Sequence, residues 1–250
     1  DLFQLLRYYS ICSALLVIVA TILLSYTYWW ISRSDLVYNT ELENKNLGQI
    51  LSNTFRLEFP DYITSVSGVD ADTLRARRET KAIHRVLAKL TKGLPILKVK
   101  IYNIDGLTIY SSEARQIGED KGGNPGFKMA VTSGLPASKL SYHNEISAFS
   151  GVKFDRNIVE SYIPVSSVEG SVAWVFELYT DVTSRIVDIQ ETATKLILRL
   201  LVFFTTLYGL LFLVVRRADQ ILKSQYSQLT ESAISLGNAI AVAEQREREL

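Results

Sequence analysis

The sequence predicts an α+β fold in which a long N-terminal helix packs on an antiparallel sheet, flanked by two transmembrane helices and followed by a C-terminal coiled-coil helix. Two apolar stretches, residues 8–32 and 200–215, carry no charge and enclose a region of ordinary globular sequence. Inside that region, helical spacing of apolar residues gives way to the alternation of strands. After the second stretch, apolar residues recur in heptads. The expected parts are a first span (1–33), a folded insert (34–194), a second span (195–217) and a coiled coil (218–250).

The first apolar stretch is long enough to cross a membrane, since a helix rises about 1.5 Å per residue and the hydrocarbon core is about 30 Å thick. A cleaved signal peptide would have a shorter apolar core, roughly 7–15 residues, followed by a small-residue cleavage site. Residues 26–30 instead contain two Tyr and two Trp, which are typical of a membrane interface. We therefore expect an uncleaved anchor. The second span includes Arg199, whose side chain can reach the interface from inside the helix.

Basic residues indicate the orientation. Arg216, Arg217 and Lys223 follow the second span directly, and cytoplasmic flanks are enriched in such residues. Only Arg7 precedes the first span, so that span adds little to the assignment. We expect both termini in the cytoplasm and the insert outside it, in the periplasm if the cell is Gram-negative.

Charge and cysteine content narrow the function classes. The net charge is +1 over 250 residues, which argues against nucleic-acid binding as a global function. The single cysteine, Cys12, lies in the first span, so the insert must hold together through its core rather than through a disulfide. The chain begins with Asp1 and stops inside the heptad pattern, and we expect the functional output region of the protein to lie beyond Leu250.

Two helices are expected before the strands. Apolar residues at near-helical spacing over residues 34–57 predict that the first span continues as one long helix ending before Pro60. After a turn at residues 67–68, a second helix should begin at Asp70 or Asp72 and run to about residue 90. The basic residues of this helix are expected to form a solvated face rather than an anion site. They are Arg75, Arg77, Arg78 and Lys81.

The remainder of the insert has the alternation of strands. Residues 96–104 and 107–112 flank Asp105-Gly106, a typical hairpin turn. A Gly-rich segment and a short helix near residues 127–132 should follow. The later strands are expected at residues 137–143, 157–165 and 171–180, the last two joined by a turn at residues 169–170.

Alternation also sorts the strand residues by face. Leu97, Val99 and Ile101 should pack against the long helix, which leaves Lys98, Lys100 and Tyr102 on the other face. The same parity groups Glu160 with Tyr162, and Glu177 with Tyr179.

A loop-rich segment, residues 113–156, could close over this second face and make a concave site with polar groups among aromatic side chains. The alternative is that the same residues form the solvent face of the sheet, which would alternate identically. The candidate ligand-binding residues are Lys100, Tyr102, Glu160, Tyr162, Glu177 and Tyr179. Lys100 would favour a carboxylate or another anion.

No catalytic constellation is evident. The two histidines, His84 and His143, have no Cys, His or carboxylate neighbours at zinc-ligand spacing and are expected to be surface or packing residues. No GxxxxGK motif is present, and no histidine follows His143 as a phosphoacceptor. We expect a chain without a catalytic domain, metal ion or cofactor.

Several segments together carry a family resemblance. They are residues 99–106 (VKIYNIDG), 110–112 (YSS), 117–120 (IGED), 161–165 (SYIPV) and 175–183 (VFELYTDVT). In this order and spacing they look like the single-Cache, PAS-like extracytoplasmic domains of bacterial transmembrane sensors. The exit of the second span, residues 214–219 (VVRRAD), is similar to sensor histidine kinases and diguanylate cyclases that lack a HAMP linker.

The resemblance implies a multi-pass receptor of the bacterial inner membrane, with a PAS-like sheet that binds a small extracellular ligand and relays the signal to a cytoplasmic output domain. A histidine kinase is the first expectation for that domain. A diguanylate cyclase, a chemoreceptor and a membrane-anchored protein-docking module are alternatives. The expected relay residues are Asp181, Thr183, Arg216 and Arg217.

The heptad series predicts a modest parallel coiled coil, and hence a homodimer. Its core positions include small and polar residues, which suits a helix that must switch between two packings. An amphipathic helix lying against a separate domain is the alternative. The series is Leu222, Tyr226, Leu229, Ala233, Leu236, Ile240, Ala243, Glu247 and Leu250.

Overall fold

The computed structural model describes residues 2–66, 68–167 and 170–248. The chain divides into two compact units: Tyr26–Ala193 forms one, and Asp1–Ser25 with Thr194–Leu250 forms the other. Leu250, Ser67 and Glu169, which take part in the predicted heptads and turns, lie outside the described residues.

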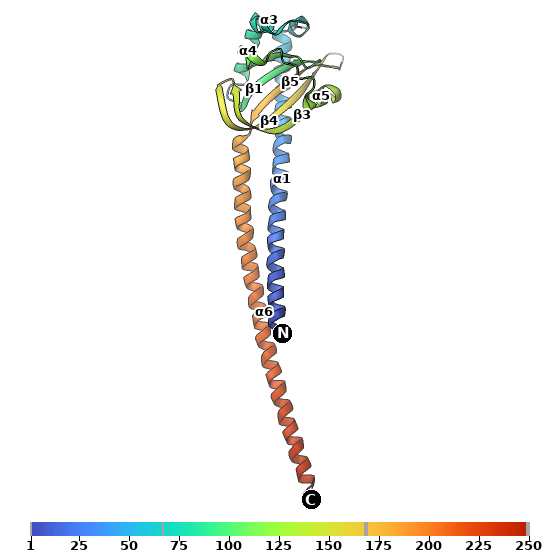
Figure 1. The fold of residues 1–250 in the computed structure, drawn as a ribbon, viewed down its shortest axis with the longest axis vertical. Helices are drawn as coiled ribbons and strands as arrows, with labels where there is room; N and C mark the ends of the chain where they lie inside the picture. Colours follow the sequence, from blue (N-terminus) through green and yellow to red (C-terminus); the bar gives the residue numbers. More distant parts are fainter. Residues whose placement is uncertain (1, 67, 168–169, 249–250) are drawn as a thin grey trace. The chain divides into compact units, whose positions relative to one another are not determined.

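Two long helices begin and end the chain (Figure 1). Helix α1 runs over Leu2–Glu58 and α6 over Thr183–Arg248. The segments Ile11–Glu58 and Thr183–Ser235 are long and apolar enough to span a membrane, and their best windows have mean hydropathies of 2.1 and 2.2. These windows are almost entirely unburied, unlike the core helix of a soluble protein. The predicted continuation of the first apolar stretch into one helix that ends before Pro60 is confirmed.

The single helix predicted from Asp70 to residue 90 is wrong. A short helix, α2 (Tyr62–Ser65), is followed by α3 (Ala71–Ala76) and α4 (Arg78–Leu90). Arg77 separates the last two with extended backbone angles, φ −57° and ψ 143°. The change of direction lets both Leu74 on α3 and Ile83 on α4 reach the core, where each is fully buried. Asp70 caps α3 as predicted, accepting hydrogen bonds from the backbone N–H groups of residues 72 and 73.

The predicted antiparallel sheet is confirmed, and in the described part of the chain it has five strands in the order β2-β1-β5-β4-β3. Every neighbouring pair is antiparallel. A 3₁₀ turn, η1 (Ala114–Gln116), and a helix, α5 (Pro125–Ser133), connect β2 to β3. The strands are β1 (Ile96–Asn103), β2 (Thr108–Ser111), β3 (Ala137–Ala148), β4 (Gly151–Ser166) and β5 (Val172–Asp181).

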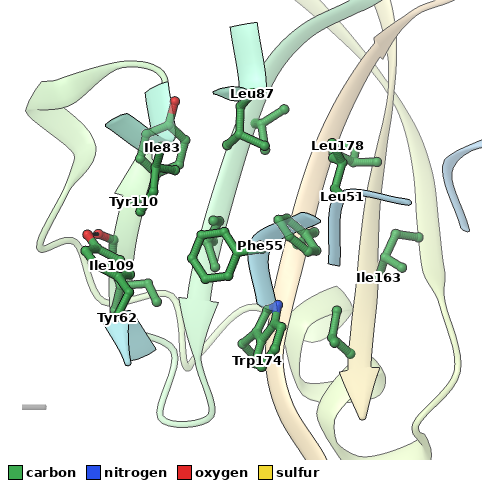
Figure 2. Close-up of a cluster of buried hydrophobic side chains, with 14 of the residues drawn as sticks. Leu51, Phe55, Tyr62, Ile83, Leu87, Ile109, Tyr110, Ile163, Trp174 and Leu178 are labelled. Atoms are coloured by element: carbon green, nitrogen blue, oxygen red, sulfur yellow. Dashed lines mark hydrogen bonds between the residues drawn. The ribbon is translucent and has the colours of Figure 1, made fainter. Parts of the chain in front are cut away.

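One face of the sheet packs against the C-terminal part of α1. Leu51 and Phe55 of α1 join the main hydrophobic cluster together with residues of β1, β4 and β5 (Figure 2). Val99 and Ile101 belong to this cluster, as predicted. Leu97 does not: the β1–β5 register shifts between Ile96 and Lys98, and Leu97 packs instead on the opposite face against Ile146, Ile158 and Tyr179.

The surface that α1 presents to the sheet includes a stripe of small and polar residues. Thr40, Asn44, Gly48 and Ser52 follow at intervals of four residues and are all buried. Four-residue spacing places them on one side of the helix. A Cβ atom on Gly48 would lie 2.8 Å from Cγ2 of Ile163, so glycine permits the close approach of α1 to β4.

Candidate functional site

A pocket of about 540 Å³ lies on the face of the sheet that points away from α1. All six predicted ligand-binding residues line it: Lys100, Tyr102, Glu160, Tyr162, Glu177 and Tyr179. They are buried, with Lys100 only 2% and Glu177 only 1% exposed. The alternative of a solvent face is therefore wrong for these residues. Their role in binding stays a prediction.

Two segments enclose the pocket. The connection from β2 supplies Glu113, Arg115, Gln116, Lys121 and Asn124, and the β3–β4 hairpin supplies residues 143 and 145–147. The hairpin reaches β1, where the N–H of Phe149 donates to the carbonyl of Leu97 at 2.9 Å. The location predicted for the closing segment is thus right. The strand predicted at residues 137–143 is confirmed, but it continues to Ala148 and β4 begins at Gly151, so the loop-rich character predicted for residues 144–156 is wrong.

Helix α5 covers one end of the same face. Asn124 caps this helix by accepting hydrogen bonds from the N–H groups of Gly126 and Phe127, at 2.9 and 3.3 Å. Phe127 packs edge-to-face on Tyr102, with ring centroids 5.6 Å apart. A Cβ on Gly126 would come within 2.6 Å of the Tyr162 ring, so this glycine lets α5 form a close wall of the pocket.

Glu177 provides a buried carboxylate among tyrosines. The phenol of Tyr102 donates a hydrogen bond to its Oε2 atom. Burial, and then the negative charge of Glu177, raise the pKa values of Tyr102, Tyr162 and Tyr179. The three phenols therefore stay protonated at neutral pH, and the single O–H of Tyr102 is already donated to Glu177.

The two buried lysines differ in their partners. Lys98 donates to Glu113 at 3.0 Å and to Gln116 at 3.4 Å. Lys100, directly opposite Glu177 in the β1–β5 register, has its nearest described carboxylate oxygen, from Glu119, 3.9 Å away. Burial lowers the pKa of Lys100, and the attraction of Glu177 only partly opposes this. Lys100 is thus an incompletely compensated cation in the pocket wall.

Glu160 is, by contrast, well satisfied. Its Oε1 atom accepts from Ser141 at 2.6 Å and lies 2.9 Å from Nε2 of His143, and its Oε2 atom pairs with Lys139 at 3.0 Å. Burial would raise the pKa of Glu160, but hydrogen bonds from Ser141, Lys139 and His143 outweigh it and hold the pKa below its ordinary value. Both oxygens of this carboxylate already have partners within the protein.

His143 is one of several pocket residues that sequence reasoning did not assign to the site. Its ring contacts Glu160 and lies 6.3 Å, centroid to centroid, from Tyr179. The predicted strand ended at this residue, so His143 was assigned no place on a face. Had the strand been extended, residues 139, 141 and 143 would have been placed on one face, because alternate residues of a strand point to the same side. His84 is an exposed surface residue, within the expectation, and its Nδ1 atom lies 3.1 Å from the Tyr110 hydroxyl.

Arg75 departs from the predicted solvated basic face. Its guanidinium donates to the backbone carbonyls of Ala114 at 3.1 Å and Ile117 at 2.8 Å. Ala114 begins the η1 turn and Ile117 follows it, and this turn carries Arg115 and Gln116 into the pocket. Arg75 therefore holds a pocket wall in place.

Two of the predicted relay residues lie at the junction of β5 and α6. Asp181 Oδ1 accepts the N–H of Thr183 at 2.9 Å, and its Oδ2 atom lies 3.5 Å from Arg156. Thr183 Oγ1 accepts the N–H of Asn157 at 2.9 Å. These bonds tie the start of α6 to β4. Arg216 and Arg217 are exposed on α6 in the other unit.

The arrangement favours reversible binding. It offers phenol hydroxyls, one under-compensated cation and buried carboxylates, which suit a small polar molecule. Within the described ranges, no three His, Cys, Asp or Glu side chains are grouped so that they could hold a metal ion.

No protein-family model matches the sequence, and no curated protein matches it. Solved structures similar to this chain include a sensory box sensor histidine kinase from Vibrio cholerae, with 14% identity over 42% of this chain and 98% of that one and a TM-score of 0.29. The sensor domain of the V. cholerae histidine kinase DctB is 14% identical over 60% of this chain and 57% of that one, with a TM-score of 0.32. The E. coli DcuS sensor domain is 12% identical over 57% and 98%, with a TM-score of 0.33. At scores this low, these likenesses carry no argument about ligand or output.

Proposed function

We propose that this chain is the sensing and signal-transmitting region of a bacterial membrane receptor. Its pocket binds a small extracellular ligand, and α6 relays the binding event to a cytoplasmic output domain, with a histidine kinase as the first candidate. The observation that carries the proposal is the pocket itself. It buries the carboxylate of Glu177 and the phenol of Tyr179 on β5, and this strand leads directly into α6.

The ligand carries an anionic group that binds next to Lys100. An anion there completes the compensation of Lys100, and the hydroxyl of Tyr162, which lines the pocket, contacts the ligand and helps to select its shape. Glu160 is engaged by Ser141, Lys139 and His143 and contributes mainly to the wall. Ligand binding produces a signal only if the two conformations of the receptor differ in affinity.

The signal leaves through the β5–α6 junction. Because Asp181 and Thr183 fix the first turn of α6 to β4, a displacement of the pocket strands changes the position of that turn. The apolar part of α6 crosses the inner membrane, and Arg216 and Arg217 hold its cytoplasmic end at the interface. The exposed residues Leu222, Tyr226 and Leu229 then form the seam of a homodimer whose packing reports the signal.

A thermal-shift screen of the full chain in lipid nanodiscs tests the proposal. The library contains carboxylates, amino acids, amines, phosphate esters and nucleobases. A ligand that binds only the folded state raises the unfolding temperature. We expect at least one anionic compound to do so, and both Lys100→Met and Tyr162→Phe to reduce its shift.

Tyr142→Phe is the matched control, because Tyr142 is exposed on the same sheet and does not line the pocket. It should leave the shift unchanged. A compound whose shift is insensitive to both pocket variants binds elsewhere and counts against the site. A well-folded protein with no shift across the library would contradict small-molecule sensing and favour the protein-docking alternative.

A further inference from the structure

Asn44 connects α1 to the two strands that carry most of the pocket. It is 2% exposed, although it belongs to the helix that continues the first apolar stretch. Its Nδ2 atom donates to Ser161 Oγ at 2.9 Å, and its Oδ1 atom accepts from Thr180 Oγ1 at 2.9 Å. Both ends of one buried amide are therefore bound to the sheet.

The two hydroxyls are direct chain neighbours of the pocket residues. Ser161 lies between Glu160 and Tyr162 on β4, and Thr180 follows Tyr179 on β5. Alternation along a strand turns the hydroxyls toward α1 and their neighbours into the pocket. Ser138 on β3 adds a further bond, donating to Ser161 Oγ at 2.8 Å. Asn44 therefore contacts the backs of the strands whose fronts form the site.

The same helix is tied to α6 one turn earlier. Arg185, in the first turn of α6, donates to the buried Thr40 hydroxyl at 3.4 Å and pairs with Glu43 at 3.1 Å. A movement of α1 relative to the sheet therefore also changes its contact with the helix that leaves β5.

We propose that Asn44 is a positioning residue that couples the pocket to α1, so that the receptor transmits its signal through both helices rather than through α6 alone. This inference rests on the proposed sensory function. When β4 or β5 shifts, the hydroxyls of Ser161 and Thr180 shift with it. Apolar contacts can slide, but a buried amide cannot replace lost hydrogen bonds with water, so α1 follows.

The Asn44 amide can form its two hydrogen bonds to the hydroxyls of Ser161 and Thr180 in two orientations. A hydroxyl can donate or accept, so the Asn44 amide can turn over and bind the same two side chains with the roles exchanged. A coupling element needs two arrangements that the site can bias. The amide and its two hydroxyls meet this requirement within a single turn of helix.

The test needs no ligand, because a substitution perturbs the pocket instead. Glu177→Gln removes the central charge of the pocket, and hydrogen exchange of the full chain in lipid nanodiscs reports the response of α1. We expect exchange rates of backbone amides over residues 38–48 to change at least about twofold, the lower end of coupling within a shared network. In an Asn44→Leu background the same substitution should cause no change.

Asn46→Leu is the matched control, since Asn46 lies on the exposed side of the same turn. It should preserve the full response to Glu177→Gln. If Asn44→Leu does not fold, Thr180→Val decides the question, because valine keeps the shape of threonine without its hydroxyl; the response should then fall to half or less. A response that survives these variants, or no response in the parent, would overturn the inference. Failure of the ligand screen would leave this result untouched.

Discussion

The two faces of one sheet bury their side chains to a similar degree but with opposite chemistry. Toward α1, Val99, Ile101 and Phe176 pack in an apolar cluster. Toward the pocket, their strand neighbours Lys100 and Glu177 are just as buried but charged. Burying apolar surface stabilises a fold by about 25 cal/mol per Å², whereas burying charge costs free energy unless it is fully paired. Burial on the face toward α1 therefore supplies most of the sheet's contribution to the free energy of unfolding, whereas burial of charge on the pocket face reduces it.

The apolar face should show the largest effect of a single change. Phe176→Ala leaves a cavity beneath α1, because Phe176 is fully buried and its ring lies 6.3 Å from that of Phe55. We expect a loss of about 3–5 kcal/mol in the free energy of unfolding, measured by denaturant titration. Phe154→Ala, at a residue that is 59% exposed, is the control and should cost far less. Equal losses would contradict the proposed division between the faces.

Overpacking the same interface should have a smaller effect. Gly48→Ala places a Cβ 2.8 Å from Ile163 Cγ2, which cannot move away as the end of a flexible chain could. Over most of its range, the overpacking cost of about 1–3 kcal/mol exceeds the roughly 1 kcal/mol that alanine adds to helix stability. We expect a net loss in unfolding free energy. Gly123→Ala, where nothing lies within 4 Å of the added atom, should be nearly neutral. A stabilised Gly48→Ala would show that α1 and β4 are less closely packed.

The buried tyrosines of the pocket face should make the free energy of unfolding depend on pH in the alkaline range. The pKa of Tyr102 is raised in the folded protein, so the unfolded chain loses the proton first, near its ordinary pKa of 10.0. Stability from this group is complete below about pH 10 and falls as the pH rises further. Tyr102→Phe should reduce the alkaline slope of unfolding free energy by about 1 kcal/mol per pH unit. Tyr142→Phe, at an exposed hydroxyl, should reduce it less; the reverse order would count against a buried phenol cluster.

The smallest expected effect has the opposite sign. Lys100→Met removes a buried cation whose pKa is lowered by burial, and methionine can fill the space of its aliphatic chain. We expect the free energy of unfolding to rise by about 0.5–1 kcal/mol while ligand binding is lost, a trade-off typical of functional sites. Lys128→Met at an exposed position is the control. A destabilised Lys100→Met would mean that Glu177 and Glu119 already compensate this charge.

Local periodicity was enough to predict much of the fold. The helical spacing of residues 34–57 and the distance to Pro60 predicted how α1 continues and ends. The Asp105-Gly106 turn predicted the β1–β2 hairpin, and strand parity predicted that Lys100, Glu177 and Tyr162 share a face. These features depend on neighbouring residues in the chain, because helix and strand periods act over a few residues.

The prediction stopped where long-range pairing decides the structure. The polar residues around His143 have no apolar alternation of their own, and pairing with β4 is what keeps them extended. The sequence does contain a turn signal there, the dipeptide Ser150-Gly151. The structure places a turn at this point, and Gly151 has a φ of 100°. The register shift beside Leu97 and the break at Arg77 likewise follow from what each segment packs against.

The sequence by itself determined which residues alternate, which segments are helical and which stretches are apolar enough for a membrane. Only the tertiary structure decided that the charged face is buried, that the β3–β4 hairpin closes it, and that Asn44 binds two strands more than one hundred residues away. The reason is physical: alternation is a local property of the backbone, whereas burial and hydrogen-bond partners depend on which distant segments meet.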